Sequence, residues 1–391
     1  MNRTTLSLIV PGLIDPVPFL KELPVQDLPD LPVFSSFLSR GRYIKPDSYD
    51  HSNNNLYTCL LKQFSLQTQY SQPPISSLSY LLDTKSLDIK SLDTKILEKK
   101  NSAECELNEQ FSPKELKHKW LMRVDPCFMA ADRDQLLLAQ TGNLDISWQE
   151  AKQIEQEINQ FYSQLDDDNF WTLKVISPDR WYLISDKPIA IETTPPEKVL
   201  GQSLKSYLFS ANTEEDRYWL NLFNEFQMIL HQSQFNKHRR ENNKRPVNSV
   251  WFWGQDNSID LLNPLSDKKD TSCDRVLYSN NIVAQGMSLV SGGNYFQVPD
   301  HYLSVANEVD QKIIYVLDDF FRALQNKDIF TWIGLLKQFE KNFCQAIYND
   351  IESGKISQLE LISPTGTKLI VTKKLLRRWW RKNKKFYLFL Q

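Results

Sequence analysis

The stretch SWQEAKQIEQEINQFYSQLDDDNFWTLKVISPDRWYLI, residues 147–184, decides the fold class of this chain. Ser147 and Glu150 form a capping box, after which apolar residues recur every three or four positions, at Ala151, Ile154, Ile158, Phe161 and Leu165. This spacing predicts an amphipathic helix. A hairpin is predicted directly after it, with strands over 170–176 and 181–184 and a turn at 177–179. Together they indicate a compact α/β unit over about residues 120–191.

Further strands and helices are predicted on both sides of this unit. Residues 6–10 read as a buried strand ended by Pro11-Gly12, and residues 33–38 as a short helix ended before Gly41. The later pattern predicts helices over 214–231 and 332–351, strands over 249–253 and 312–317, a hairpin turning at 364–366, and a basic C-terminal helix. Strands interleaved with helices predict an α/β fold with a mixed, mostly parallel sheet covered by helices.

Composition limits the kinds of partner that the whole molecule attracts. The 391 residues carry 46 basic and 48 acidic side chains, so any attraction to nucleic acid or membrane must be local. No apolar run approaches the roughly 20 residues of a membrane helix, so we expect neither a transmembrane segment nor a signal peptide. The five cysteines are scattered and fit reduced thiols, which predicts a cytoplasmic protein.

Residues 83–113 differ in character from the rest of the sequence. A five-residue pattern recurs at Leu82, Leu87 and Leu92, and five matches neither the helix nor the strand period. We therefore predict a low-complexity surface insertion over 83–113.

Two stretches carry a resemblance to a known family. The first runs from Trp120 to Pro126 and continues with Ala131-Asp132-Arg133-Asp134; the second contains Asn236-Lys237-His238-Arg239-Arg240 and then RPVNSVWFWG over 245–254. The combination resembles bacterial RpfE-type regulatory proteins, which are similar to archaeal-type cofactor-independent phosphoglycerate mutases. The resemblance implies an alkaline-phosphatase-like α/β core with an inserted smaller α/β domain. The expected division is 1–82 as the first part of the core, 83–113 as the insertion, 114–200 as the inserted domain and 201–391 as the remainder.

The same resemblance raises the question of catalysis. Mutases of that superfamily hold two divalent metals with Asp and His ligands around a nucleophilic serine. The first ligand is expected after the glycine that ends the first strand, but this chain has Leu13 after Gly12, and Asp15 is displaced. After Gly254 the only histidine is His301. We therefore predict no catalytic residue and no cofactor, and interpret the chain as a non-catalytic regulatory or binding module, a pseudoenzyme.

An active enzyme is the alternative. It would be a metal-dependent phosphoglycerate mutase or phosphatase with an altered ligand set, holding Mn or Zn through Asp15, Asp318, Asp319 and His301. Asp318 and Asp319 close a predicted strand, where ligands of α/β folds gather.

Arginines form the predicted anion site. Arg239, Arg240 and Arg245 are expected in a loop before the strand over 249–253, and the resemblance implies that arginines near it clamp phosphate and carboxylate. Arg123 and Arg133 are secondary candidates. The competing interpretation is a solvated basic loop with structural ion pairs elsewhere. The expected partner is a small phosphorylated ligand or an unidentified protein.

The end of the sequence is locally basic. Residues 373–385 contain eight Lys and Arg side chains around Trp379 and Trp380, which suits anionic lipid, RNA or DNA. Nucleic-acid association through this segment is a third functional possibility. The alternative is a packing role, with the indole rings on the edge of the core and the charges in water.

Overall fold

The computed structural model describes residues 4–21, 23–45, 56–68, 73–84, 119–133, 135–142, 144–165, 169–209, 212–257, 262–264, 274–304, 311–325 and 328–390. The chain divides into two compact units. The first combines Met1–Pro73 with Asn263–Gln391, and the second is the continuous segment Pro74–Leu262.

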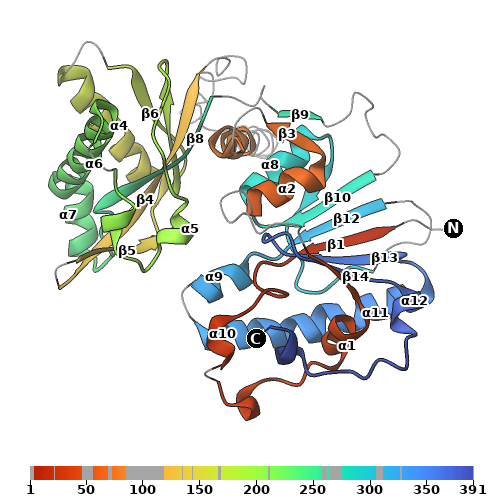
Figure 1. The fold of residues 1–391 in the computed structure, drawn as a ribbon. Helices are drawn as coiled ribbons and strands as arrows, with labels where there is room; N and C mark the ends of the chain where they lie inside the picture. Colours follow the sequence, from red (N-terminus) through yellow and green to blue (C-terminus); the bar gives the residue numbers. More distant parts are fainter. Residues whose placement is uncertain are drawn as a thin grey trace, which may run out of the picture. The chain divides into compact units, whose positions relative to one another are not determined.

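A seven-stranded sheet forms the centre of the first unit (Figure 1). Its order is β11 (Asn294–Phe296), β10 (Asp274–Ser279), β12 (Gln311–Val316), β1 (Thr5–Ile9), β13 (Gln358–Ile362), β14 (Lys368–Val371) and β2 (Arg42–Ile44). The first five strands run parallel, and β14 and β2 are antiparallel additions at one edge. The predicted mixed, mostly parallel sheet is confirmed.

Helices cover both faces of this sheet, as Figure 1 shows. One face carries α1 (Pro32–Arg40), α9 (Asp319–Gln325), α10 (Ile329–Phe339), α11 (Gln345–Ser353) and α12 (Lys373–Leu376); the other carries α2 (Leu56–Phe64) and α8 (Ile282–Val290). Leu6 and Leu8 of β1 point into the large core beneath the first group. Ser7 and Ile9, which alternate with them, are buried as well. A central parallel strand buried on both faces reads as a continuous apolar run, which explains why β1 was predictable.

A π-helical turn, Glu340–Cys344, joins α10 to α11, so the helix predicted over 332–351 is interrupted in the middle. The carboxylate of Glu340 accepts hydrogen bonds from the backbone N–H groups of Val33 (2.8 Å) and Phe34 (3.0 Å). These amides open α1, whose N-cap residue Leu31 has no side-chain acceptor. Glu340 therefore caps α1 from a distant part of the sequence.

The second unit contains a five-stranded antiparallel sheet. β5 (Gln135–Thr141), β4 (Trp120–Asp132), β7 (Arg180–Ser185) and β6 (Trp171–Ser177) follow one another, and β8 (Ser249–Asp256) also pairs with β4. Its main helices are residues 75–84, α4 (Trp148–Leu165), α6 (Glu214–Gln232) and α7 (Gln234–Glu241). Short elements elsewhere in the chain are η1 (Pro18–Lys21), η2 (Val25–Asp27), β3 (Leu66–Thr68), α5 (Pro196–Val199), η4 (Leu204–Ser206) and β9 (Leu262–Pro264).

The stretch that decided the fold class has the predicted structure. The N–H of Ser147 donates to Glu150 Oε2 (2.7 Å), and the N–H of Glu150 donates to Ser147 Oγ (3.2 Å), which completes the capping box of α4. The hairpin β6–β7 follows the helix. Both local predictions are confirmed.

The second unit is larger than the inserted domain expected over 114–200. Strand β8 lies far along the sequence but pairs with β4, with Phe252 opposite Val124. Helix α6 packs against β8, with the rings of Trp219 and Phe226 centred 6.0 and 5.5 Å from that of Phe252. Because of these contacts, the second unit extends to Leu262. The low-complexity segment predicted over 83–113 lies outside the described residues, apart from its first two.

The predicted basic C-terminal helix is wrong. α12 has four residues, and turns follow it until the short 3-10 helix η7, Phe386–Phe389. Leu375 and Leu376 are buried, but Trp379 and Trp380 are 82% and 64% exposed. A helix is stabilised mainly by an apolar stripe that it can bury, and this segment has none beyond Leu376. Among the described residues, no helix has the length and hydrophobicity to cross a bilayer.

Candidate functional site

Asp15, the first candidate metal ligand, lies in the loop after β1. Its carboxylate accepts hydrogen bonds from the N–H of Gly12 (3.3 Å), the hydroxyl of Ser363 and the hydroxyl of Thr365 (2.7 Å). Ser363 and Thr365 belong to the turn between β13 and β14. Asp15 thus ties the β1 loop to this turn. Gly12 adopts φ +75°, and a Cβ there would clash with Leu324, so backbone conformation and packing both require the glycine.

The other candidate ligands belong to other segments of the first unit. Asp318 and Asp319 follow β12, and Asp319 opens α9. His301 is exposed on a separate loop. In the ranges that the structure describes, no three His, Cys, Asp or Glu side chains are grouped so that they could hold a metal ion. The described side chains do not fit the two-metal centre that the resemblance implies, because Asp15 is not grouped with two further ligands of this kind.

Arg239, the first candidate for anion binding, lies in a helix. α7 begins at the Ser233 cap and includes Arg239 and Arg240, so the loop predicted for these two is wrong, whereas Arg245 lies in a loop as predicted. The side chain of Arg239 is 1% exposed. Its guanidinium donates to the backbone carbonyls of Arg245 (2.8 Å), Asp145 (3.0 Å) and Leu144, and to Glu150 Oε1 (3.2 Å). These contacts join α7 to the loop before α4 and favour a structural role.

Three further candidate arginines are exposed. Arg240 lies on the solvent side of α7, and Arg133 occupies the β4–β5 turn with φ +56°. Arg245 donates to Gln140 Oε1, and its guanidinium carbon lies 5.1 Å from the ring centroid of Phe128. An anion clamp made of these arginines stays a prediction.

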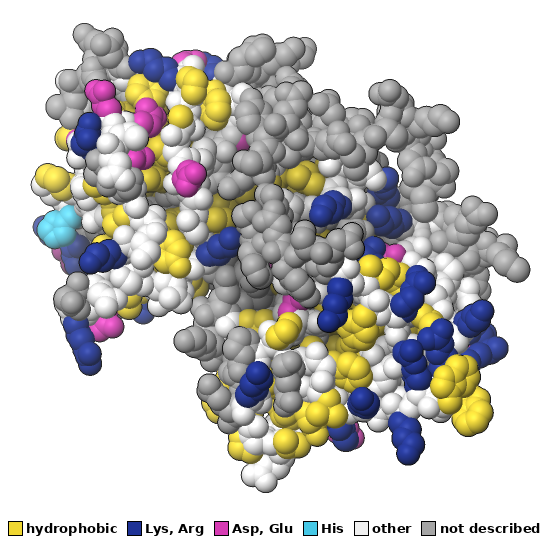
Figure 2. Space-filling model, in the orientation of Figure 1, with side chains coloured by type: hydrophobic (Ala, Val, Ile, Leu, Met, Phe, Trp, Pro, Cys, Tyr) yellow, Lys and Arg dark blue, Asp and Glu magenta, His cyan; other side chains and the backbone are white. Residues whose placement is uncertain are grey.

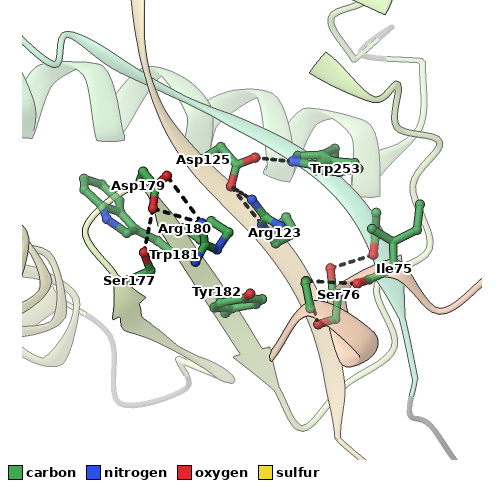
Figure 3. A network of polar contacts seen from close by, with 12 residues as sticks. Ile75, Ser76, Arg123, Asp125, Ser177, Asp179, Arg180, Trp181, Tyr182 and Trp253 are labelled. Atoms are coloured by element: carbon green, nitrogen blue, oxygen red, sulfur yellow. Dashed lines mark hydrogen bonds and ion pairs between the residues drawn. The ribbon is translucent and has the colours of Figure 1, made fainter. Parts of the chain in front are cut away.

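Arg123 is the centre of a buried polar network in the second unit (Figure 3). Its Nε and Nη2 donate to Asp125 Oδ1 at 2.8 and 2.6 Å, and the indole N–H of Trp253 donates to Asp125 Oδ2 at 2.7 Å. The guanidinium also lies over the rings of Tyr182 and Trp253, at 5.5 and 5.2 Å. Arg123 and Asp125 are each 5% exposed, so this pair is a structural element of the unit's interior.

Glu150 provides a prediction about pH dependence. Burial raises its pKa, but hydrogen bonds from Ser147 and the nearby Arg239 guanidinium outweigh burial and hold the pKa below its ordinary 4.5. A lowered folded-state pKa stabilises the fold above the unfolded-state pKa, and that stability is lost as pH falls through the folded value. Glu150→Gln should therefore lower the urea midpoint at pH 7, and the difference from wild type should shrink below about pH 4.5. The exposed Glu192→Gln is the control, and equal effects of both variants at each pH would contradict the assignment.

A basic pocket lies in the first unit, between α2 and the face of the sheet that carries Arg275, Lys312 and Lys368. Its volume is about 610 Å³. The residues lining it come from α2 and the residue after it, from five strands of the sheet and from the β13–β14 turn: Thr5, Thr58, Cys59, Lys62, Gln63, Ser65, Arg275, Gln311, Lys312, Glu360, Ile362, Ser363, Pro364, Gly366 and Lys368. Among the described residues that line the pocket, four cationic side chains therefore face one carboxylate, that of Glu360.

Backbone carbonyls hold two of these cations in place. Lys312 Nζ donates to the carbonyl of Gln63 and Arg275 Nη1 to that of Phe64, both at 2.9 Å. Lys368 pairs with Glu360 at 3.0 Å, and Lys62 is exposed at the rim. The carbonyls belong to the C-terminal end of α2, where cations are also favoured by the helix dipole.

The pKa of the Cys59 thiol is affected by three lysines of the pocket. Burial raises the pKa of its thiol to about 11, although the charges of Lys62, Lys368 and Lys312 all lower it. Three lysines therefore act on a single side chain of α2. The thiol is neutral at physiological pH, so the positive charge in the pocket is not offset by a thiolate.

Sequence reasoning missed this pocket because its cations are isolated in the sequence. Lys312 and Lys368 lie at the beginning of strands β12 and β14, and the residues that follow them in each strand are buried. One signal in the sequence could have indicated the pocket: a charged residue at the start of a strand that is covered on both faces. Such a charge is costly to bury in an apolar core, so it must lie in a polar recess.

Comparisons with known proteins relate part of the chain to one enzyme family. No protein-family profile matches it. A segment of 78 residues is 32% identical to the 2,3-bisphosphoglycerate-independent phosphoglycerate mutase of Methanosarcina barkeri. The chain is similar to a phosphoglycerate mutase over that segment. The match spans 19% of this chain and 19% of the relative.

Two solved structures match this chain at low identity. The PH0037 protein from Pyrococcus horikoshii has a TM-score of 0.46 at 13% identity, covering 95% of this chain and 88% of that one. The cofactor-independent phosphoglycerate mutase from Thermoplasma acidophilum has a TM-score of 0.39 at 12% identity, covering 95% and 90%.

Proposed function

We propose that the chain is a non-catalytic, phosphoglycerate-mutase-like binding module that holds a small phosphorylated carboxylate in the basic pocket. The observation that carries the proposal is the convergence of Lys62, Arg275, Lys312 and Lys368 on one cavity of about 610 Å³. Phosphate and carboxylate groups are recognised by such charge-assisted donors. The cavity falls in the range of small-molecule sites, about 300–1,000 Å³.

The chemistry of the pocket supports binding without turnover. Phosphoryl transfer needs an activated nucleophile and a means of neutralising the charge that develops on the phosphate. Cys59 is a neutral thiol with a raised pKa, and Asp15 is tied to Ser363 and Thr365. A regulatory role, in which the ligand controls contact with a protein partner, follows from such a site more directly than catalysis does.

The test is isothermal titration of the full chain with 3-phosphoglycerate, and with inorganic phosphate as a second probe. Lys62→Glu should weaken 3-phosphoglycerate binding about 10-fold or more, and Lys62→Glu with Lys312→Gln about 100-fold, because each charge-assisted hydrogen bond contributes about 1.5–3 kcal/mol. Lys337→Glu, an exposed change on α10, is the matched control and should leave binding unchanged.

Ligand binding in the pocket and the absence of catalysis are contradicted by different outcomes. Unchanged affinity in the double variant, with an unchanged thermal midpoint, would remove the ligand from this pocket. Interconversion of 2- and 3-phosphoglycerate by the wild-type chain with added Mn²⁺ would overturn the non-catalytic assignment and favour the active-mutase alternative.

A further inference from the structure

An exposed tryptophan pair in a basic loop is unused by the proposed function. Trp379 and Trp380 are 82% and 64% exposed, and their rings make an edge-to-face contact with centroids 6.2 Å apart. They lie in residues 377–385, between buried Leu376 and buried Phe386. We call residues 373–385 the basic tryptophan loop.

The chain holds this loop firmly at both ends. Arg40 Nη1 donates to the carbonyl of Leu376 (2.7 Å), and the N–H of Lys384 donates to Ser39 Oγ (2.9 Å). Lys385 pairs with Asp30 at 2.8 Å. The tryptophans are therefore presented on a fixed surface rather than on a loose tail, and apolar area exposed in this way marks an interaction site.

Positive charge surrounds the pair. Six of the eight cations in the loop are exposed, namely Lys374, Arg377, Arg381, Lys382, Lys384 and Lys385. Within the described part of the chain, only Lys385 of these eight forms an ion pair. Figure 2 shows Lys and Arg side chains gathered around a hydrophobic patch at the lower right, on the side where Figure 1 places α12.

We propose that the basic tryptophan loop binds the surface of anionic lipid membranes. Indole rings favour the interface between headgroups and acyl chains, and cations near an anionic bilayer are attracted to its surface potential. Two adjacent tryptophans with a ring of lysines and arginines supply both contributions. This inference does not depend on the pocket.

The geometry of the pair favours lipid over single-stranded nucleic acid. Successive bases stack on aromatic rings that offer parallel faces along a groove. Here the two ring planes meet at 84°, so they cannot form two consecutive stacking platforms. Two exposed rings at this angle suit insertion between lipid headgroups.

Co-sedimentation of the full chain with vesicles tests the proposal. Vesicles of 70% phosphatidylcholine and 30% phosphatidylglycerol should bind the protein, and pure phosphatidylcholine should bind it much less. Trp379→Ser with Trp380→Ser should weaken binding about tenfold or more, through lost apolar burial. Lys382→Glu with Lys384→Glu should weaken it about 25-fold or more, since each cation near the surface contributes about fivefold.

Matched controls separate binding from folding. Phe330→Ser removes an aromatic ring that is 89% exposed on α10, and Lys337→Glu with Lys341→Glu changes the same charge outside the loop. Both should bind vesicles as the wild type does, and all four variants should keep the wild-type thermal midpoint.

Three outcomes would overturn the proposal. They are no preference for anionic vesicles, equal binding by the loop variants and the controls, and tryptophan-dependent binding of a 20-nucleotide single-stranded RNA in place of vesicles.

Discussion

Replacing Arg239 with methionine should lower the free energy of unfolding of the second unit by about 3–5 kcal/mol. The substitution removes every donor that now satisfies the carbonyls of Leu144, Asp145 and Arg245. It also leaves Glu150 without its arginine partner. The contact with Leu144 is buried and the other three are partly buried, and an unsatisfied buried acceptor costs about 1–3 kcal/mol, so the losses together are large. Urea unfolding followed by circular dichroism measures the effect.

Arg240→Met is the matched control, because Arg240 is the next residue of α7 and is exposed. It should change the free energy of unfolding by no more than about 0.5 kcal/mol. Arg239→Lys should also be destabilising, since an ammonium cannot reproduce the geometry of a guanidinium with several acceptors. Similar losses for the two methionine variants would show that Arg239 is not the anchor.

Removing the carboxylate of Asp125 is expected to have the second large effect. Asp125→Ala leaves the Arg123 guanidinium buried without its counter-charge and the Trp253 indole N–H without its acceptor. Breaking a buried pair from one side costs about 3–5 kcal/mol, which a thermal or urea unfolding curve of the second unit resolves. The exposed pair Lys119–Asp186 gives the comparison, and Asp186→Ala should cost at most about 1 kcal/mol.

A double variant tests whether the stability lost in Asp125→Ala comes from the unpaired charge of Arg123 or from the loss of a favourable ion pair. If the loss in Asp125→Ala comes from the stranded guanidinium, Arg123→Met combined with Asp125→Leu should be more stable than Asp125→Ala alone. Additive losses in the double variant would contradict this explanation.

Local signals in the sequence were sufficient for much of the fold. The capping box of Ser147 and Glu150, the hairpin around Pro178 and the apolar run of β1 each depend on residues close together in the sequence. Helix α7 was missed because its only buried apolar residue is Phe235, and its other buried side chains are Asn236 and Arg239. A hydrophobic pattern cannot reveal a helix that is held by polar side chains.

The candidate site was harder to predict for a different reason. Lys62, Arg275, Lys312 and Lys368 are separated by tens to hundreds of positions, and only the strand order β10-β12-β1-β13-β14 brings three of them to one face. The run of arginines around Arg239, which stood out in the sequence, contains a buried anchor. Clustering in sequence indicated charge but not the direction of each side chain.

The central position of β1 also determines when each unit can fold during synthesis. The strand Thr5–Ile9 pairs with β12 and β13, and the first turn of α1 is capped by Glu340. Ribosomal synthesis is sequential, so these early residues have no native partners until residues beyond 311 have emerged. The unit Pro74–Leu262 is continuous and is complete before then. The second unit can therefore fold on the nascent chain before β1 and α1 have the strands and helices against which they pack.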